Sequence, residues 1–470
     1  MSHELKARSG TSLTSSQIVW RSISELRCSS RNARTHSKKQ IAQIAKSISD
    51  FGFLNPIVIG PDRRIIVGHA RYKAARLLGL TMAPTISVTH LSEAAIRAYA
   101  LADNRLAEKA GWDRELLAIE LNELQELLPK EELTLDDTGF DSAEIDRLLL
   151  DIDNDKPDPV DDVPQLHARA TARLGDSFLL GRNRLFVGDA RRLQSFEALM
   201  QGERAGMAIL DPPYNVRILG HVGGRGRIKH REFVCGSGEM SAREFEGFLH
   251  ETLALCAKFS KDGSIHYVFM DWRHVNELLQ AGAKAYGQLK NVCVWVKSNA
   301  GQGAFYRSQH ELVFVFKHGD APHINTFELG QHGRNRSNVW HYAGVNSFRA
   351  GRLDELKIHP TVKPVTLVAD AIQDCSRRGD IVLDAFAGSG TTIMAAERLG
   401  RRAYCLELDP IYADVAIRRW QAYTGRDAVL AETGETFDEL SATRAAADLA
   451  AVADTILKDG AKPASRRRRA

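Results

Sequence analysis

The stretch Met207-Ala208-Ile209-Leu210-Asp211-Pro212-Pro213-Tyr214-Asn215-Val216 indicates the fold around which the second half of the chain is built. Its four leading apolar residues predict a buried strand. The two prolines cannot donate backbone hydrogen bonds to a neighbouring strand, so the strand ends at Asp211. This stop leaves a carboxylate, the carbonyl of Pro212 and the ring of Tyr214 at the carboxyl end of a strand. In open α/β sheets, that edge is where ligands bind.

Short apolar runs alternate with helical patterns from residue 173 onward. This alternation is typical of a mainly parallel sheet that is covered by helices on both faces. Besides 207–210, the strand candidates are 184–187, 265–270, 292–296, 312–316, 381–383 and 403–406. We therefore predict an α/β fold with a Rossmann-like, doubly wound sheet of seven strands over residues 173–430.

A glycine turn, Asp384-Ala385-Phe386-Ala387-Gly388-Ser389-Gly390-Thr391-Thr392, follows the strand candidate 381–383 and leads into a helix. Strand, glycine turn and helix in this order are typical of a site for a nucleoside-bearing cofactor, because glycine lets a ligand approach the backbone. The next strand ends in Glu407, an acid about twenty residues on that is suited to ribose hydroxyls. No lysine follows Gly390, so the turn is not a phosphate-binding P-loop.

The composition is that of a soluble globular protein, with 44% hydrophobic and 26% charged residues. A length of 470 residues predicts two or three domains. No apolar run reaches membrane-spanning length, and the N-terminus has no signal-peptide core. The six cysteines are scattered, so we predict no metal site, no disulfide framework and a cytoplasmic location.

Residues 1–150 predict a smaller α+β domain. Two short strands, 56–59 and 64–67, are joined by a turn, and helices are expected around 41–51, 69–78, 93–108, 114–127 and 142–150. The segment from Asp151 to Pro164 has three prolines and six aspartates and no periodicity. We therefore predict an acidic linker over residues 151–172.

The smaller domain resembles the N-terminal domain of the ParB family over about residues 20–110. Gly68-His69-Ala70-Arg71 aligns with that family's Gly-Glu-Arg-Arg box, and Asn104 and Arg105 align with its later Asn/Arg motif. The resemblance implies a nucleotide box made of Gly68, Arg71, Asn104 and Arg105, which in ParB proteins binds the triphosphate of a cytidine nucleotide. His69 replaces the glutamate of the family, and this favours the alternative, a structural or DNA-contacting module.

Four motifs of the larger domain together resemble the β class of DNA amino-methyltransferases, over about residues 173–425. Asp211-Pro212-Pro213-Tyr214 is similar to their catalytic motif, and the glycine turn with Glu407 is similar to their S-adenosylmethionine motif. The segment 359–364, His-Pro-Thr-Val-Lys-Pro, is similar to the one that packs over the methionine end of the cofactor. Val187-Gly188-Asp189 is similar to a further cofactor motif. The motif order is permuted, because the glycine turn comes after the catalytic motif.

The resemblance implies site-specific transfer of a methyl group from S-adenosylmethionine to the N6 amine of a flipped adenine in double-stranded DNA. In that reaction Asp211 and the Pro212 carbonyl accept the amine hydrogens, Tyr214 stacks on the base, and Pro213 completes the motif. The residues that the resemblance assigns to the cofactor are Asp189, Thr361, Lys363, Asp384, Phe386, Gly388, Ser389, Gly390, Thr391, Thr392 and Glu407. Within the family, Asp at the first position of the motif is typical of adenine N6 enzymes and Ser of cytosine N4 enzymes.

Basic segments are the candidate DNA contacts, because phosphates are bound locally. One is the Gly/Arg-rich stretch 221–231, for which an ordinary solvated loop is the alternative, and the other lies in the region 320–357, where the family places its target-recognition segment. The candidate residues are Arg225, Arg227, Lys229, Arg231, Arg334 and Arg336. Residues 431–470 predict an Ala-rich basic tail. The expected partners are double-stranded DNA, a second copy of the chain and a separately encoded restriction enzyme, without a membrane.

Two alternatives to an adenine N6 enzyme stay open. The first is a cytosine N4 DNA methyltransferase, since the same acceptors can hold either amine. The second is a ParB-like DNA-binding regulator with an inactive methyltransferase domain, against which the intact Asp211, Tyr214, Gly388 and Glu407 argue. RNA is a weaker substrate alternative, because basic segments do not distinguish the two polymers.

Overall fold

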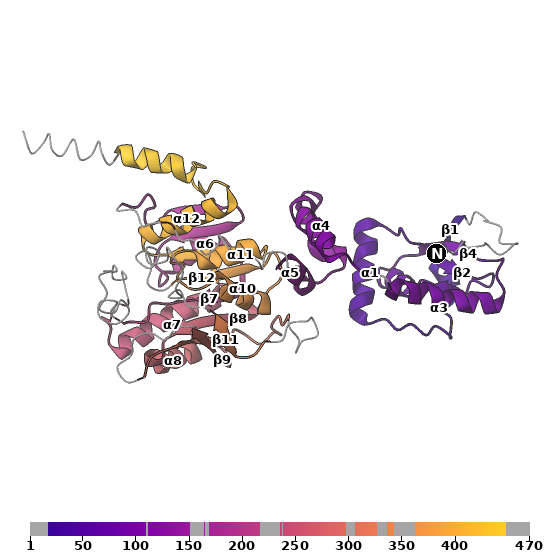
Figure 1. Cartoon of the computed structure of the whole chain (residues 1–470), viewed down its shortest axis with the longest axis horizontal. Helices are drawn as coiled ribbons and strands as arrows, with labels where there is room; N and C mark the ends of the chain where they lie inside the picture. The colour runs from indigo at the N-terminus through magenta and orange to yellow at the C-terminus, as the bar shows by residue number, and fades with distance from the viewer. Residues whose placement is uncertain are drawn as a thin grey trace, which may run out of the picture. The chain divides into compact units, whose positions relative to one another are not determined.

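The computed structural model describes residues 17–109, 111–150, 164, 169–216, 236, 238–297, 306–326, 336–342 and 362–447. Backbone contacts group the chain into two units, Met1–Asn154 and Asp155–Ala470. We call them the N-terminal unit and the C-terminal unit, and Figure 1 labels many of the helices and strands of each. None of the helices in these ranges is long and apolar enough to cross a membrane.

The N-terminal unit contains a four-stranded sheet in the order β1-β4-β2-β3. The strands are β1 (Ile18–Ser22), β2 (Ile57–Ile59), β3 (Ile65–Val67) and β4 (Met82–Ser87). The sequence predicted β2 and β3 but missed the other two. β4 was missed because it contains Pro84, whose missing N–H argues against a strand. β1 was missed because its large apolar residue Trp20 is exposed, so the strand shows no clear alternation of apolar and polar residues.

Helices cover this sheet and extend the unit. They are α1 (Lys38–Phe51), α2 (His69–Leu77), α3 (Glu93–Lys109), α4 (Arg114–Leu127) and α5 (Ser142–Leu150), close to the predicted ranges. α1 begins where the Ser37 hydroxyl accepts a hydrogen bond from the backbone N–H of Gln40 at 3.1 Å. It ends at Gly52, whose φ of 82° is readily adopted only by glycine.

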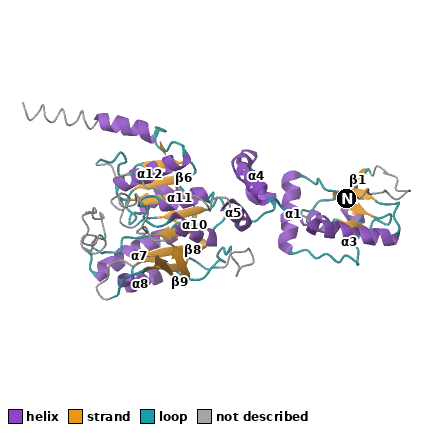
Figure 2. Ribbon diagram, viewed as in Figure 1, coloured by secondary structure: helices purple, strands orange, loops and turns teal. Residues whose placement is uncertain are grey.

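Within the described residues, the C-terminal unit is built on a ten-stranded sheet in the order β11-β9-β10-β8-β7-β12-β13-β6-β5-β14. Figure 2 colours the strands orange and the helices purple. The strands are β5 (Ser177–Leu180), β6 (Asn183–Val187), β7 (Ala205–Leu210), β8 (Ser260–Met270), β9 (Gln288–Lys297), β10 (His310–Lys317), β11 (Val339–Tyr342), β12 (Ile381–Asp384), β13 (Arg402–Glu407) and β14 (Val429–Leu430). The central β7 is buried at all six residues, which explains its continuous apolar run.

Helices cover both faces of this sheet. On one face, α6 (Leu193–Met200), α7 (Ala242–Lys258) and α8 (Val275–Ala285) share an apolar core with Ala208 and Leu210 of β7. On the other face, α10 (Val365–Cys375) brings Cys375 to within 3.9 Å of the Met207 sulfur. α11 (Thr391–Arg398) and α12 (Pro410–Thr424) pack against β12 and β13. The predicted doubly wound α/β fold is confirmed.

Two details of the prediction for this unit are wrong. The sheet has ten strands rather than seven, because β5, β11 and β14 are only four, four and two residues long and carry no clear apolar pattern. The predicted tail from residue 431 belongs in part to the folded unit, since Phe437 and Leu440 are buried and the Phe437 ring lies 5.7 Å from Phe178. Most of the predicted linker 151–172 lies outside the described residues.

Candidate active site

The carboxyl ends of β6, β7, β12 and β13 lie at one edge of the sheet, because these strands run parallel to one another. Asp211 follows β7, Asp384 ends β12 and Glu407 ends β13. β10 runs antiparallel to β8, so its second residue, Glu311, comes to the same edge. β9 is antiparallel to β10 and therefore brings its last residue, Lys297, there as well.

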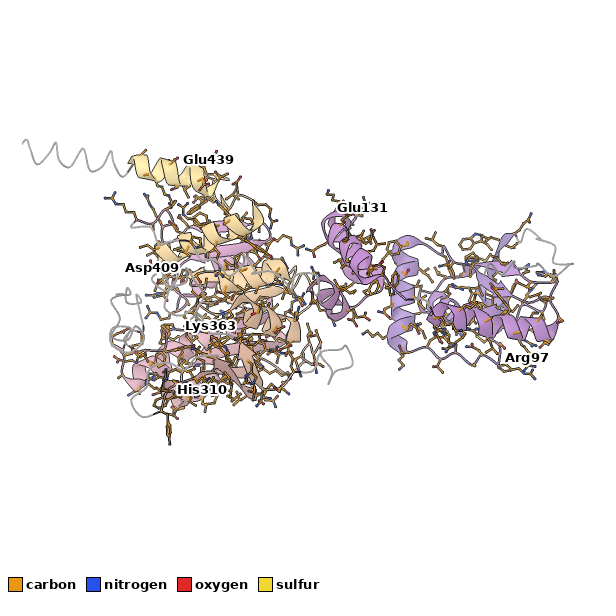
Figure 3. The ribbon with its side chains drawn as sticks, in the orientation of Figure 1. Arg97, Glu131, His310, Lys363, Asp409 and Glu439 are labelled. Atoms are coloured by element: carbon orange, nitrogen blue, oxygen red, sulfur yellow. The ribbon has the colours of Figure 1, made fainter. Side chains whose placement is uncertain are left out.

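A cluster of buried and partly buried charged groups surrounds Asp211. The ammonium of Lys363 (labelled in Figure 3) donates to Asp211 Oδ2 at 2.6 Å and lies 3.3 Å from Glu311 Oε2. Lys297 Nζ lies 2.5 Å from the other oxygen of Glu311. The Tyr214 hydroxyl lies 2.8 Å from Asp211 Oδ1 and 3.0 Å from Glu311 Oε2. We call these five residues the amine-site cluster.

Burial and mutual charge set the protonation of the amine-site cluster. Burial raises the pKa of the Asp211 carboxyl above its ordinary value, although the Lys363 ammonium acts in the opposite direction. Burial also opposes ionisation of Glu311, but Lys363 and Lys297 lower its pKa to about 2. The pKa of Lys363 is raised, because Asp211 and Glu311 outweigh the effect of its burial. At neutral pH the cluster therefore holds ionised Lys363 and Glu311 next to Asp211.

Asn215, which follows the Pro-Pro turn, is tied to residues 238–240. Its side-chain oxygen accepts from the backbone N–H groups of Gly238 and Met240 at 3.1 and 3.2 Å, and its amide donates to the Met240 carbonyl at 2.8 Å. Gly236 packs directly on Pro213, since a Cβ added to this glycine would lie 2.7 Å from the Pro213 Cβ. These contacts fix the turn that carries the Pro212 carbonyl.

The glycine turn and Glu407 form one structure. The two Glu407 oxygens accept from the backbone N–H groups of Gly388 at 2.7 Å and Asp409 at 2.8 Å. Burial raises the pKa of Glu407 to about 7. Gly390 has a φ of 81°, and a Cβ there would lie 2.8 Å from the Cβ of Ala416 in α12. A side chain does not fit at that position, so the glycine lets the turn pack closely against α12.

Polar side chains inside the turn have protein partners. Thr392 donates to Asp384 Oδ2 at 2.6 Å, and the Phe386 N–H donates to Asp384 Oδ1 at 2.9 Å. Burial raises the pKa of Asp384 to about 7. Ser389 and Thr391 both contact the guanidinium of Arg419, whose Nη1 lies 3.1 Å from the Ser389 carbonyl. The side chains of Ser389, Thr391 and Thr392 therefore shape the turn from within.

These residues fit a nucleoside-bearing cofactor. Glu407 has lone pairs beyond the two backbone donors that can accept ribose hydroxyls, and the partly buried Phe386 offers an apolar surface beside them. Asp189, which we predicted for the adenine of the cofactor, follows β6 and is paired with Arg191 at 2.7 Å. Arg191 lowers the pKa of the Asp189 carboxyl although burial acts against this. The assignment of Asp189 to the cofactor stays a prediction.

Two of the predicted cations are paired with carboxylates. Lys363 contacts the glycine turn through its carbonyl, 3.4 Å from the Thr391 hydroxyl, while its ammonium belongs to the amine-site cluster, and its role toward the cofactor stays a prediction. Arg336 does not face solvent as a DNA contact, because its guanidinium lies 3.0 Å from both Asp370 and Asp374. The predicted Thr361, Arg225, Arg227, Lys229, Arg231 and Arg334 lie outside the described residues.

A cavity of about 610 Å³ lies in the N-terminal unit, next to the predicted nucleotide box. Its lining includes Asn104 and Arg105 of the box, but not Gly68 and Arg71, which pack against each other. The cavity is basic, since its cationic side chains outnumber Asp62, Glu93 and Glu108; they are Arg31, Arg34, Arg64, Arg97 and Arg105. His69 also lines it and accepts from the backbone N–H of Ser29 at 3.2 Å, and burial lowers its pKa.

Glu311 and Lys297 were missed by the sequence analysis. Each directly flanks a predicted strand, Glu311 before the run 312–316 and Lys297 after the run 292–296. A charged residue next to an apolar strand at its ligand-binding end was the available signal. The signal was ambiguous, because charged residues at strand ends more often face solvent.

Comparisons with known proteins agree with this geometry. Residues 206–418 match the N6/N4 methyltransferase family described as DNA methylase. Residues 115–174 match the ParB-methyltransferase HTH domain, and residues 7–105 match the ParB N-terminal domain. The second match covers α5 and all but the first residue of α4, two helices that the sequence analysis had placed in the smaller domain.

Individual relatives are known for both units. The type II methyltransferase M.HpaI of Haemophilus parainfluenzae is 27% identical over 241 residues, which are 47% of this chain and 70% of the relative. The ParB-like nuclease domain-containing protein YnaK of Escherichia coli (strain K12) is 42% identical over 77 residues, 16% of this chain and 88% of the relative. The crystal structure of the M1.HpyAVI-SAM complex matches with 19% identity and a TM-score of 0.37 over 50% of this chain and 97% of that one. On the family matches and the two sequence relatives, the C-terminal unit carries an N6/N4-type DNA methylase domain and the N-terminal unit carries a ParB-like domain.

Proposed function

We propose that the chain transfers a methyl group from S-adenosylmethionine to the N6 amine of an adenine at a specific site in double-stranded DNA. One observation carries the proposal: Asp211, the Pro212 carbonyl and Tyr214 lie at the same sheet edge as the glycine turn and Glu407. An amine-binding group and a nucleoside-binding group at one edge are what methyl transfer to a base requires. The resemblance to adenine N6 enzymes, which begin this motif with Asp, favours adenine over cytosine.

The cofactor is S-adenosylmethionine, which supplies a methyl group that its sulfonium makes electrophilic. Glu407 and the backbone of the turn at Gly388 and Gly390 would hold it. An amine inside duplex DNA is inaccessible, so the base must leave the stack to reach the protein. Asp211 and the Pro212 carbonyl then accept one amine hydrogen each, which directs the nitrogen lone pair toward the cofactor. Positioning and the negative charge of Asp211 near a nitrogen that becomes positive supply most of the rate.

The test is single-molecule sequencing of DNA from cells that express the wild type, Asp211→Ala or Asp427→Ala. Asp427 is an exposed acid of the same unit and serves as the matched control. N6-methyladenine at one sequence motif in the wild type and the control, and its absence in Asp211→Ala, is the expected result. Detection of N4-methylcytosine instead would show that the chain is a cytosine N4 methyltransferase. No modified base, with folded and cofactor-binding protein, would favour the inactive DNA-binding regulator or an RNA substrate.

The basic cavity of the N-terminal unit supports a second function. We propose that it binds a nucleoside triphosphate, because it is large enough for a small ligand and five arginines line it. Two of these, Arg34 and Arg105, already contact Glu108, and Arg64 lies 3.1 Å from Asp62. Within the described residues, no carboxylate lies within salt-bridge distance of the guanidinium of Arg31 or Arg97. These two are therefore available for phosphates.

The probe for this cavity is CTP, chosen from the resemblance to ParB, and the measurement is titration calorimetry on the full-length protein. Arg97→Ala (Arg97 is labelled in Figure 3) should weaken CTP binding by about tenfold or more, since hydrogen bonds to charged groups contribute about 1.5–3 kcal/mol. Arg76→Ala is the control, because Arg76 is exposed on α2 and does not line the cavity. Equal affinity of wild type and Arg97→Ala, or no binding of CTP, contradicts the assignment.

A further inference from the structure

The amine-site cluster contains more charged groups than the binding of an amine requires. Lys363 and Glu311 retain side-chain exposures of only 7% and 13%, and Lys297 retains 29%. The four charged groups alternate in sign, from Asp211 to Lys363 to Glu311 to Lys297, with successive contacts of 2.6, 3.3 and 2.5 Å. Buried ionised groups are costly unless each is paired, so the alternation keeps all four in place.

A count of hydrogens shows why Lys363 is needed. The Tyr214 hydroxyl has one hydrogen but lies within 3.0 Å of two carboxylate oxygens, one of Asp211 and one of Glu311. It can therefore donate fully to only one of them. The Lys363 ammonium has three hydrogens and lies within 3.3 Å of both carboxylates and of the Tyr214 oxygen. Without Lys363, the carboxylates of Asp211 and Glu311 would share the single hydrogen of the Tyr214 hydroxyl.

The five members of the cluster come from four parts of the chain. Asp211 and Tyr214 belong to the turn after β7, Lys297 ends β9 and Glu311 is near the start of β10. Lys363 precedes α10, and its carbonyl is held by the Thr391 hydroxyl of the glycine turn at 3.4 Å. Lys363 therefore touches the cofactor turn with its backbone and the amine acceptor with its side chain.

We propose that Lys363 and Glu311 are positioning residues for methyl transfer: Lys363 keeps the Asp211 carboxylate ionised and oriented, and Glu311, anchored by Lys297, holds Lys363 in place. The proposal rests on the methyltransferase function proposed above. Neither residue needs to touch the base. Asp211 Oδ2 is fixed by the ammonium, so its remaining lone pairs have one defined direction for the amine hydrogen.

Opposite effects of the two residues on Asp211 make the proposal testable. The positive charge of Lys363 lowers the pKa of Asp211, whereas the negative charge of Glu311 raises it. Removing Lys363 therefore moves the pKa of Asp211 up, and removing the charge of Glu311 moves it down. Among the residues that the structure describes, the other titratable groups that face this site are Tyr214, Lys297 and the more distant Asp384, and all three are kept unchanged.

The experiment measures single-turnover methyl transfer by the full-length protein, at saturating cofactor and DNA, as a function of pH. Wild-type rates should fall at acid pH as Asp211 becomes protonated. Lys363→Met should reduce the rate at neutral pH roughly 100-fold, as removal of one preorganised electrostatic contact does, and move the acid limb to higher pH. Glu311→Gln should move the acid limb to lower pH. Lys363→Arg, which keeps the charge, should leave the limb near its wild-type position.

Lys284→Met is the matched control, because Lys284 pairs with Glu246 at the surface of the same unit, with a contact of 2.5 Å, and should behave as wild type. The proposal is overturned if the acid limb of the pH–rate profile stays in place in both Lys363→Met and Glu311→Gln, or moves in the same direction in both. In that case an active wild type still supports the methyltransferase function. A folded wild type without any methyl transfer to DNA overturns both. If Lys363→Met fails to fold, the direction of the Glu311→Gln limb decides.

Discussion

Asp384 imposes a pH-dependent penalty on the stability of the C-terminal unit. It ends β12 with only 4% of its surface exposed, and its carboxylate receives hydrogen bonds from the Phe386 N–H and the Thr392 hydroxyl but faces no cation within the described residues at salt-bridge distance. Burial raises its pKa from the ordinary 3.8 to about 7. The perturbation we consider is Asp384→Asn, in which an amide can still accept from Phe386 and donate to the Thr392 oxygen.

The sign follows from proton uptake. Between pH 4 and pH 7 the folded protein keeps a proton on Asp384 that the unfolded chain has lost, so stability decreases as pH rises through this range. A shift of about three units at about 1.4 kcal/mol each gives a penalty on the order of 4 kcal/mol at pH 8. At pH 5 the pH is only about one unit above the ordinary pKa that Asp384 has in the unfolded chain, so the penalty is about 2 kcal/mol. Asp384→Asn removes this term and should stabilise the cofactor-free unit more at pH 8 than at pH 5.

The assay is guanidinium unfolding at pH 5 and pH 8, followed by tryptophan fluorescence, because Trp295 and Trp420 are buried in the C-terminal unit. The difference in unfolding free energy between variant and wild type should be about 2 kcal/mol larger at pH 8 than at pH 5. Val382→Ala in the same strand is the control, since it removes fully buried methyl groups and should destabilise equally at both values. A stabilisation by Asp384→Asn that does not change with pH would refute the reasoning.

Three further outcomes follow from the site. Gly390→Ala should destabilise the unit by about 3 kcal/mol in chemical unfolding and abolish cofactor binding, because its φ of 81° and the 2.8 Å approach to Ala416 exclude a Cβ; wild-type stability would contradict the packing. Arg336→Met should cost on the order of 3 kcal/mol, since it removes the guanidinium that lies 3.0 Å from the buried Asp374, and the salt dependence of DNA binding should not change. Cofactor affinity, measured by calorimetry, should weaken by up to about tenfold between pH 7 and pH 6 as Glu407, with its pKa of about 7, takes up a proton; a constant affinity would argue against a ribose contact.

The sequence alone was enough to predict the doubly wound sheet and most of the site. The apolar run before Asp211 and the prolines after it mark a central strand and its end in the chain itself, without reference to any distant residue. The same holds for the glycine turn, because Gly390 needs a backbone conformation that only its residue type permits. Local signals of this kind depend on a few neighbouring residues.

Only the tertiary structure decided what lies around Asp211. Glu311 and Lys297 reach it because β9 and β10 run in opposite directions, and strand direction is a property of the whole sheet. The motif placed Lys363 near the cofactor but gave no sign that its ammonium pairs with Asp211, because buried charges need partners that the fold brings from other segments. Arg336 was predicted on DNA from its charge, but α10 presents Asp370 and Asp374 to it. Sequence determined which backbone turns could form, whereas charge pairing between segments far apart in the chain needed the fold, because Coulomb attraction depends on distance in space and not on position along the chain.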